Sequence, residues 1–413
     1  MNKLISILII CLSLACISCS SGQKSINIIL KNPVNLARAD EIVTLNIDSL
    51  KSKHPDFNAN SFLIYDDDVL VPFQVQMKDG GKFISLVTNL APGEKKFLIL
   101  KYPDKIENTF KSRTYAELSM KPGNIYLDKK FRGSKFTNVT KIKVPAIHTD
   151  HDALFKYEGP GWESEKVGYR FYLDWRNAND IFGKKVSELL LSNVGVHDTV
   201  AQDDSYHSML DWGMDIFNVG KSLGIGSIGM WNDGKVIMVS ETDSVFCEIT
   251  ENGPLRSTVE TSYFGWRVGD KKYDLVSTLS ISAGSRLTRC ELEISNQPEN
   301  IVTGLIKSKG TDLLTSRGNE EWSYIALYGN QTLAGPEDKL GIAVFYKRTG
   351  LIDITEDDLS YVLKLRPDNG KVNYYFCAAW EQEPYGIKTK NDFIKYLDDT
   401  IEQLNHPIVV RAD

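Results

Sequence analysis

The sequence predicts a mainly β protein, with a small N-terminal β-sandwich followed by a large antiparallel β-sandwich and a few short helices. Three observations support this prediction. Short alternating runs of apolar and polar residues recur along the chain, turn-forming residues such as "DDD", "KDGG" and "APGE" separate them, and only two segments have the apolar spacing of a helix. With 42% hydrophobic and 25% charged residues in 413, the composition is that of a globular protein.

The first predicted part is a β-sandwich over residues 25–115. Its strand-like runs are short and closely spaced, as in antiparallel sheets. They are "EIVTLNI", "SFLIY", "VLVPFQVQM", "KFISLVTNL" and "KKFLILKY".

The second predicted part, residues 116–413, is a large antiparallel sandwich that carries the site. Its runs are too long and too numerous for a small module, and two packed sheets would leave a face for a site. They include "GKVIMVS", "STVETSYFGWRV", "YDLVSTLSIS", "RLTRCELEIS", "KLGIAVFY" and "VNYYFCAAW".

Two segments have helical spacing. The segment "NANDIFGKKVSELLL", residues 177–191, predicts a short helix with Ile181, Phe182 and Val186 inward. The segment "NDFIKYLDDTIEQLNHP", residues 391–407, places Phe393 and Leu397 on one stripe and ends before a proline, which predicts a packing helix at the C-terminus.

The N-terminus predicts export. Residues 1–18 have an early lysine and an apolar run that is too short to span a membrane, followed by small residues and cysteine. This pattern resembles a bacterial lipoprotein signal with Cys19 as the lipidated residue and Cys16 as the alternative; a cleaved signal without lipid is the other reading. We expect a lipid-anchored outer-membrane lipoprotein facing the periplasm.

Charge and cysteine usage narrow the class of partner. The formal net charge of −6 gives no overall attraction to nucleic acid, so we expect none as a partner. Cys247, Cys290 and Cys377 lie in apolar strand-like runs and are expected to be buried thiols. No P-loop or HExxH motif is present to suggest a P-loop nucleotide site or a zinc-protease site.

The densest candidate site segment is residues 148–185, "HTDHDALFKYEGPGWESEKVGYRFYLDWRNANDIFGKK". If "VGYRFYLDW" is a strand, Val167, Tyr169, Phe171, Leu173 and Trp175 face the core. Alternation then places Arg170, Tyr172 and Asp174 together on the opposite face. A solvated face with a charge pair is the simpler reading of such a strand.

A second dense segment, residues 206–231, is "YHSMLDWGMDIFNVGKSLGIGSIGMW". It supplies His207, Asp211, Trp212 and Asp215 ahead of a glycine-rich run. Trp212 and Trp162 are candidates to stack on sugar rings, although tryptophans often pack in cores. His207 could also be a structural histidine.

These two segments resemble the Bacteroidetes family filed as domain of unknown function 4861, and the strands "AGSRLTRCELEIS" and "YYFCAAWE" are similar too. The resemblance spans nearly the whole mature chain. It implies a supersandwich of the galactose-mutarotase-like kind and a place among systems that degrade uronate-rich polysaccharides such as pectin and ulvan. The family is similar to an oligosaccharide dehydratase of ulvan degradation, which implies elimination of water across C4 and C5 of a non-reducing-end uronic acid.

Residue roles follow from what that elimination requires. Arg170 is the expected partner of the uronate carboxylate, His207 the base, and Tyr172 the donor to the departing hydroxyl. Asp174 or Asp211 would orient one of these groups. The substrate-binding candidates are Trp162, Glu163, Asp174, Arg176, Asp211 and Trp212.

Four alternatives remain open at this stage. No cofactor is expected, but His148 and His151 in "HTDHD" could bind a divalent metal in place of arginine. The same base could eliminate a sugar instead of water, which would make the protein a polysaccharide lyase. A glycoside hydrolase would use Glu158, Glu163 and Asp174, and a glycan-binding lipoprotein would use aromatic platforms alone.

Overall fold

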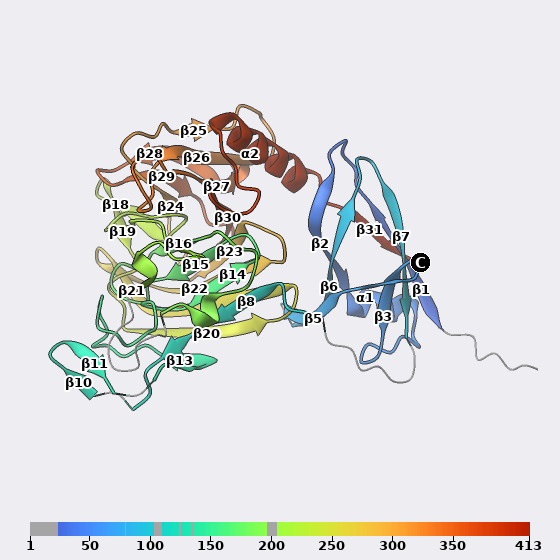
Figure 1. Ribbon diagram of the computed structural model, residues 1–413, viewed down its shortest axis with the longest axis horizontal. Coiled ribbons are helices and arrows are strands. Elements are labelled where there is room, and N and C mark those ends of the chain that lie inside the picture. Colours follow the sequence, from blue (N-terminus) through green and yellow to red (C-terminus); the bar gives the residue numbers. More distant parts are fainter. Residues whose placement is uncertain (1–23, 79, 103–109, 124, 134, 196–204) are drawn as a thin grey trace, which may run out of the picture.

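The computed structural model describes residues 24–78, 80–102, 110–123, 125–133, 135–195 and 205–413. Antiparallel sheets dominate the molecule, and a small β part lies beside a larger one (Figure 1). The predicted mainly β fold is therefore confirmed. The predicted signal and the candidate lipidation residue Cys19 lie outside the described residues.

The small part contains a five-stranded sheet in the order β31-β1-β7-β3-β4, a three-stranded sheet in the order β2-β6-β5, and a short helix. Alternation buries Ile26, Ile28 and Leu30 of β1 in their shared core. The strand and helix bounds are β1 Ser25–Lys31, β2 Arg38–Asn46, α1 Ile47–Lys53, β3 Leu63–Asp66, β4 Val69–Val71, β5 Phe73–Lys78, β6 Gly81–Leu90, β7 Lys95–Lys101 and β31 Val409–Ala412.

The last strand of the chain belongs to this small part. β31 pairs antiparallel with β1, with Ala412 opposite Ile28. The chain therefore leaves the small part after β7, builds the large part, and returns to its first sheet (Figure 1).

A nine-stranded antiparallel sheet is the largest sheet of the large part, with its strands in the order β13-β20-β21-β22-β23-β30-β27-β26-β25. Its strands are β13 Lys141–Lys143, β20 Ser244–Asn252, β21 Arg256–Val268, β22 Lys271–Ser282, β23 Leu287–Ile294, β25 Leu314–Thr315, β26 Trp322–Asn330, β27 Lys339–Lys347 and β30 Lys371–Trp380.

Two five-stranded sheets cover one face of the nine-stranded sheet, in the orders β17-β16-β15-β14-β8 and β19-β18-β24-β29-β28. Their strands are β8 Thr114–Glu117, β14 Gly161–Ser164, β15 Gly168–Phe171, β16 Asn179–Lys184, β17 Gly213–Asp215, β18 Gly229–Asn232, β19 Lys235–Met238, β24 Ile301–Ile306, β28 Leu351–Glu356 and β29 Ser360–Leu365.

Short elements complete the large part. They are β9 Ser119–Met120 with β12 Thr137–Asn138, the hairpin of β10 Ile125–Leu127 and β11 Lys130–Arg132, and the 3₁₀ turns η1 Leu191–Asn193, η2 Ser205–His207 and η3 Arg348–Gly350.

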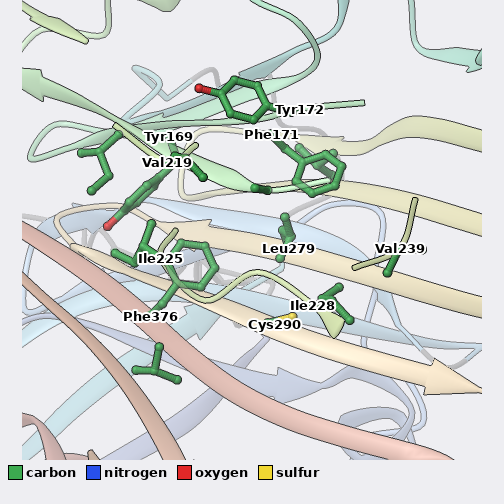
Figure 2. Packing of buried hydrophobic residues seen from close by; sticks show 14 of the residues in the cluster. Tyr169, Phe171, Tyr172, Val219, Ile225, Ile228, Val239, Leu279, Cys290 and Phe376 are labelled. Carbon is green, nitrogen blue, oxygen red and sulfur yellow. The ribbon is translucent and has the colours of Figure 1, made fainter. Parts of the chain in front are cut away.

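The core of the large part lies between the nine-stranded sheet and its covering sheets. Tyr169 and Phe171 of β15 face Leu279, Cys290 and Phe376 of the large sheet (Figure 2). The buried Tyr169 hydroxyl donates to the Arg286 carbonyl and accepts from the Ala378 N–H, both at 2.8 Å, so the layers are joined by polar bonds as well as apolar contacts.

One of the two predicted helices is confirmed. Helix α2, Lys390–Asn405, begins at the N-cap Thr389, whose hydroxyl accepts from the Asp392 N–H. It buries Phe393 and Leu397 against the outer face of the nine-stranded sheet. The outer face is the one turned away from the two covering sheets.

The helix predicted over residues 177–191 is wrong. Residues 179–184 form strand β16, and residues 191–193 form η1. β16 pairs with β15 on one side and β17 on the other, and all six of its residues are buried. Local apolar spacing cannot distinguish a helix from a strand buried on both faces, and here tertiary pairing decided the outcome.

The strand predicted over residues 167–175 is shorter than expected. β15 ends at Phe171, and a turn closed by the Asn177 N–H to the Asp174 carbonyl follows. Trp175, predicted to face the core, lies in this turn and is exposed, so that prediction is wrong. Arg170 and Tyr172, predicted to share the face opposite the core, are buried because loops cover that face, so the alternative of a solvated face is wrong.

The small and large parts are held together by polar contacts. The Gln74 side chain accepts from the N–H groups of Leu255 and Arg256, both at 3.0 Å. Arg113 donates to Asp40 of the small part at 2.8 Å and also pairs with Glu165 of the large part. These contacts fix β2 close to the outer face of the nine-stranded sheet.

One further prediction, the burial of the cysteines, can be checked against the fold. Cys247, Cys290 and Cys377 are buried free thiols, as expected. The glycines at 224, 226 and 229 have the spacing of a dinucleotide fingerprint, but they lead into strand β18 and not into a helix, so they do not form one. No helix among the described residues is long and apolar enough to cross a membrane.

Candidate active site

A buried guanidinium group is the centre of the candidate site. Arg170 of β15 donates to Asp180 of β16 through Nε at 3.0 Å and through Nη2 at 2.7 Å. Its Nη2 also donates to Asp215 of β17 at 2.6 Å and to the Tyr172 hydroxyl at 3.0 Å. We call Arg170, Tyr172, Asp180, Asp215, His207 and Glu158 the Arg170 network.

Strand pairing places these groups together. Arg170 lies directly opposite Asp180 in the β15–β16 register, and Phe182, two residues further along β16, lies opposite Asp215. Side chains at these positions share one face of the sheet because successive residues alternate between faces. That face is turned away from the nine-stranded sheet.

His207 is exposed to solvent at one end of the network. It ends the 3₁₀ turn η2, and its Nδ1 lies 3.0 Å from an oxygen of Asp215. The His207 side chain is 42% exposed, whereas that of Asp215 is 2% exposed. A buried carboxylate that holds one ring nitrogen fixes the orientation of the imidazole, as in known histidine–carboxylate pairs.

Glu158 connects the network to the exposed side chain of His151. Its carboxylate lies 3.7 Å from Arg170, accepts from Arg176 at 2.6 Å, and lies 3.6 Å from Nδ1 of His151. Glu158, His151 and Ala153 have φ of 73°, 58° and 61°. Three residues other than glycine in this sparsely populated region within one short segment mark a backbone held by its surroundings, as is common at functional sites.

Two histidines therefore stand at the two ends of one charged network. His207 is joined to Arg170 through Asp215, and His151 is joined to Arg170 through Glu158. Both imidazoles are exposed while the groups that link them are buried. A ligand from solvent can therefore reach both imidazoles, and buried carboxylates hold each of them in position.

Electrostatics differ between the carboxylates of the network. Burial, followed by the charge of Asp215, raises the pKa of Asp180 to about 6. For Glu158, burial acts in the opposite direction to the guanidinium groups of Arg170 and Arg176, and the net effect lowers its pKa. Buried groups with perturbed pKa values next to exposed histidines favour a site of proton transfer.

Tyr172 occupies the interior of the network. Its hydroxyl donates to Asp180, and its ring lies 3.8 Å from the Arg176 guanidinium. Burial is the main cause that raises the pKa of Tyr172 well above its usual value. Asp174 and Arg176 pair with each other at the edge of this cluster.

Two predicted substrate-binding residues lie elsewhere. Trp162 is fully buried, and its indole N–H donates to Thr288 at 2.9 Å, so it cannot stack on a sugar. Glu163 is fully buried, pairs with Lys184 at 2.7 Å and accepts from the Leu190 and Leu191 N–H groups. Both assignments are corrected here, because both side chains belong to the interior of the sandwich.

The remaining predicted residues lie near the surface. Asp211 is exposed, and Trp212 is half-buried with its ring 6.2 Å from that of Phe182. Sequence reasoning gave no role to Asp180 and only named Asp215, although these two carboxylates hold Arg170. Asp180 was missed because its segment was predicted as a helix. Asp215 was named because it lies close to His207 in the polar and aromatic segment 206–231.

The sequence matches the model of one family, described as "Domain of unknown function (DUF4861)", over residues 30–410. The chain belongs to this family. The matched region includes both parts of the fold and every residue of the Arg170 network.

Comparison with solved structures gives two examples of distant similarity to this DUF4861 protein. One is a protein in glycosyl hydrolase family 38 from Enterococcus faecalis, with 9% identity, a TM-score of 0.44, and coverage of 94% of this chain and 47% of that one. The other is an alpha-mannosidase from Enterococcus faecalis V583, with 9% identity, a TM-score of 0.42, and coverage of 94% and 46%. The DUF4861 protein spans about half the length of each. No curated protein matched.

The two histidines of the alternative metal site lie in different environments in this DUF4861 protein. His148 is buried, with Nδ1 2.8 Å from Asp152, while the His151 side chain is 66% exposed. Among the described residues, no three side chains of His, Cys, Asp or Glu are grouped to hold a metal ion.

Proposed function

We propose that the protein is a carbohydrate-active enzyme that eliminates water across C4 and C5 of a uronic acid at the non-reducing end of an oligosaccharide. The observation that carries the proposal is the exposed His207, oriented by the buried Asp215 and joined to a buried arginine. This arrangement suits removal of a proton from carbon by a positioned base. The resemblance to a family from uronate degradation supports the choice of substrate.

In the proposed reaction His207 takes the proton from C5. The electron pair of that C–H bond forms the C4–C5 double bond, and the C4–O bond breaks. The departing hydroxyl takes a proton from an acid and leaves as water. His151, at the other end of the network, is the candidate acid, and solvent then returns both histidines to their starting protonation states.

Arg170 has a different role from the one expected. Its Nε and Nη2 already donate to Asp180 and Asp215, so it is a positioning residue that fixes the partner of the base. Tyr172 is likewise a positioning residue, because its hydroxyl is buried against Asp180. Arg176 also pairs with two carboxylates, those of Asp174 and Glu158, but its side chain is 11% exposed, against 2% for Arg170. Because solvent reaches it, Arg176 is the better candidate of the two to neutralise the uronate carboxylate.

The product identifies the reaction. Incubation with a defined uronate-terminated tetrasaccharide should give a product lighter by one water molecule, with new ultraviolet absorbance from the conjugated double bond. Release of a shorter saccharide with the same absorbance would instead identify a polysaccharide lyase. A shorter saccharide without absorbance would identify a hydrolase, and an unchanged saccharide that stays bound would identify a glycan-binding protein.

We further propose that the mature chain is anchored to the membrane by lipid on Cys19 and faces the periplasm. The cysteine register of residues 1–23 supports this proposal. Replacement of Cys19 by serine should release the protein from the membrane fraction. Unchanged fractionation and mass of that variant would remove Cys19 and leave Cys16 to be tested.

A further inference from the structure

We propose that a second site, separate from the Arg170 network, binds an acidic sugar unit in the cleft between the two parts of the molecule. This interdomain cleft has a volume of about 550 Å³ and lies between β2 of the small part, the outer face of the nine-stranded sheet and helix α2. The residues that argue for binding are Lys166, Arg286, Arg289, Trp322, Tyr375 and Tyr396.

The cleft and the Arg170 network lie on opposite sides of the nine-stranded sheet. Arg289 and Tyr375 alternate along β23 and β30 with Cys290 and Phe376, which face the core on the other side. The Arg170 network lies beyond that core, on the far face of the sheet that contains β15. One sugar unit therefore cannot occupy both sites.

Lys166 gives the cleft a positive charge that no ion pair holds within the described residues. It is half-buried in the turn between β14 and β15, and its ammonium group has neither a hydrogen bond nor an ion pair within the described part of the chain. Burial, together with the nearby Arg286, lowers the pKa of Lys166. A group in this position gains a favourable interaction when an anion arrives.

Three carboxylates line the cleft, but each of them already pairs with a basic side chain and so does not neutralise Lys166. Asp40 pairs with Arg113 at 2.8 Å and Asp399 pairs with Lys395 at 2.6 Å. The third, Glu41, lies 3.3 Å from Arg38. None of these three cations lines the cleft.

The arginines of the cleft are held in place. Arg286 donates to the buried Glu383 at 2.8 Å, and its guanidinium lies 5.4 Å from the ring centre of Tyr396. Arg289 pairs through Nη2 with Glu291 at 3.0 Å, while its Nε is buried without a hydrogen-bond partner among the described residues. A buried guanidinium N–H without a partner favours binding of an acceptor oxygen.

Aromatic side chains supply the other half of the site. Tyr375 and Tyr396 are half-buried, and the Tyr375 ring lies 5.3 Å from that of Trp322. No hydrogen bond of the Tyr375 hydroxyl occurs within the described residues. Ring surfaces and a hydroxyl beside cations suit a pyranose that bears a carboxylate or sulfate, and the cleft volume is within the usual range for ligand sites.

Calorimetric titration of the full-length His207→Ala protein, in which turnover is removed, tests the proposal. Binding by the cleft is the difference between this protein and the same protein carrying Lys166→Ala and Arg289→Gln. The probes are a glucuronate-containing tetrasaccharide and the same tetrasaccharide with its carboxyls reduced to alcohols. We expect the acidic probe to bind, and we expect Lys166→Ala with Arg289→Gln to weaken its binding about tenfold or more. The matched control Lys271→Ala changes an exposed lysine at the start of β22 and should have no effect.

Equal binding of the two probes, or unchanged binding in the double variant, would overturn the proposal. Lysine acetylation followed by mass spectrometry gives a second readout that needs no substitution in the cleft. The acidic probe should slow acetylation of Lys166 and leave that of Lys271 unchanged, and equal acetylation of Lys166 with and without the probe would again overturn it. Both readouts measure binding alone, so they stand even if no elimination is found.

Discussion

At the scale of single residues, the main result is that Arg170 supports the site from within. An arginine on a strand in a dense polar segment predicted a direct contact with substrate. The structure instead surrounds its guanidinium with Asp180, Asp215 and Tyr172. The exposed residue of the same network is His207, which contacts Asp215, and it is therefore the proposed contact with substrate.

We expect Arg170→Lys to lower both stability and turnover. Lysine keeps the charge but cannot donate in the planar, two-pronged geometry that joins two carboxylates. The free energy of unfolding should fall by about 3 kcal/mol, since breaking a buried ion pair is costly. Turnover should fall about 10²-fold if Asp215 shifts by about 1 Å.

Denaturant unfolding and steady-state kinetics measure these two effects. Arg267→Lys is the matched control, because the Arg267 side chain on β21 is 51% exposed. Its ion pair with Glu241 is long, at 4.0 Å. It should change stability by less than about 0.5 kcal/mol. An Arg170→Lys protein as stable and as active as the wild type would show that the network does not support the site.

Sequence reasoning found half of this network. Alternation along residues 167–175 grouped Arg170 with Tyr172, and the dense segment at 206–231 supplied His207. It could not identify Asp180 or Asp215 as partners, because strand pairing between distant segments determines those contacts. It also misplaced Trp162 and Glu163, since a pattern of residue types does not show which polar groups are buried.

At the scale of elements, the short strand β17 brings Asp215 to the network. β17 begins at Gly213, whose φ of 128° lies in a region that residues with side chains rarely adopt. A Cβ atom at Gly213 would lie 1.9 Å from the Gly183 carbonyl oxygen of β16. The β16–β17 pairing therefore depends on this glycine.

We expect Gly213→Ala to separate β17 from β16 and to displace Asp215. Strained backbone alone costs about 1–3 kcal/mol, and the clash with Gly183 adds to it. Melting temperature and turnover should both fall. Gly335→Ala, where no atom lies within 4 Å of the added Cβ, is the control and should leave both unchanged. Normal turnover in Gly213→Ala would contradict the role given to β17.

The elements themselves were largely predictable. The period-2 runs predicted most long strands of both parts, and the capped apolar stripe predicted α2. The exception is the segment 177–191, of which residues 179–184 form a strand that is buried on both faces, so its polar residues are internal and period-2 alternation is lost. The order of strands in the sheets, and the return of β31 to β1, depend on contacts that no local pattern contains.

At the scale of the whole molecule, one core joins the three large sheets, and all three described cysteines are buried in it or beside it. Burial is the main cause that raises the pKa of each thiol to about 12. The thiolate, which is the reactive form, is therefore scarce at neutral pH.

We expect Cys247, Cys290 and Cys377 to resist a thiol reagent at pH 8 in the native protein. All three should react once denaturant unfolds the sandwich. Peptide mass mapping after timed labelling measures this, with the unfolded protein as the control. Rapid labelling of any of the three in the native state would show that the sheets open more readily than this core implies.

The proposed chemistry depends most on His207, so the turnover of a folded His207→Ala protein tests the account most directly. On a uronate-terminated tetrasaccharide, kcat should fall by about 10²–10⁴ while KM changes little, because a base acts in the transition state. His406→Ala, a change at an exposed histidine at the end of α2, should leave kcat unchanged. A kcat close to that of the wild type in folded His207→Ala would contradict the account.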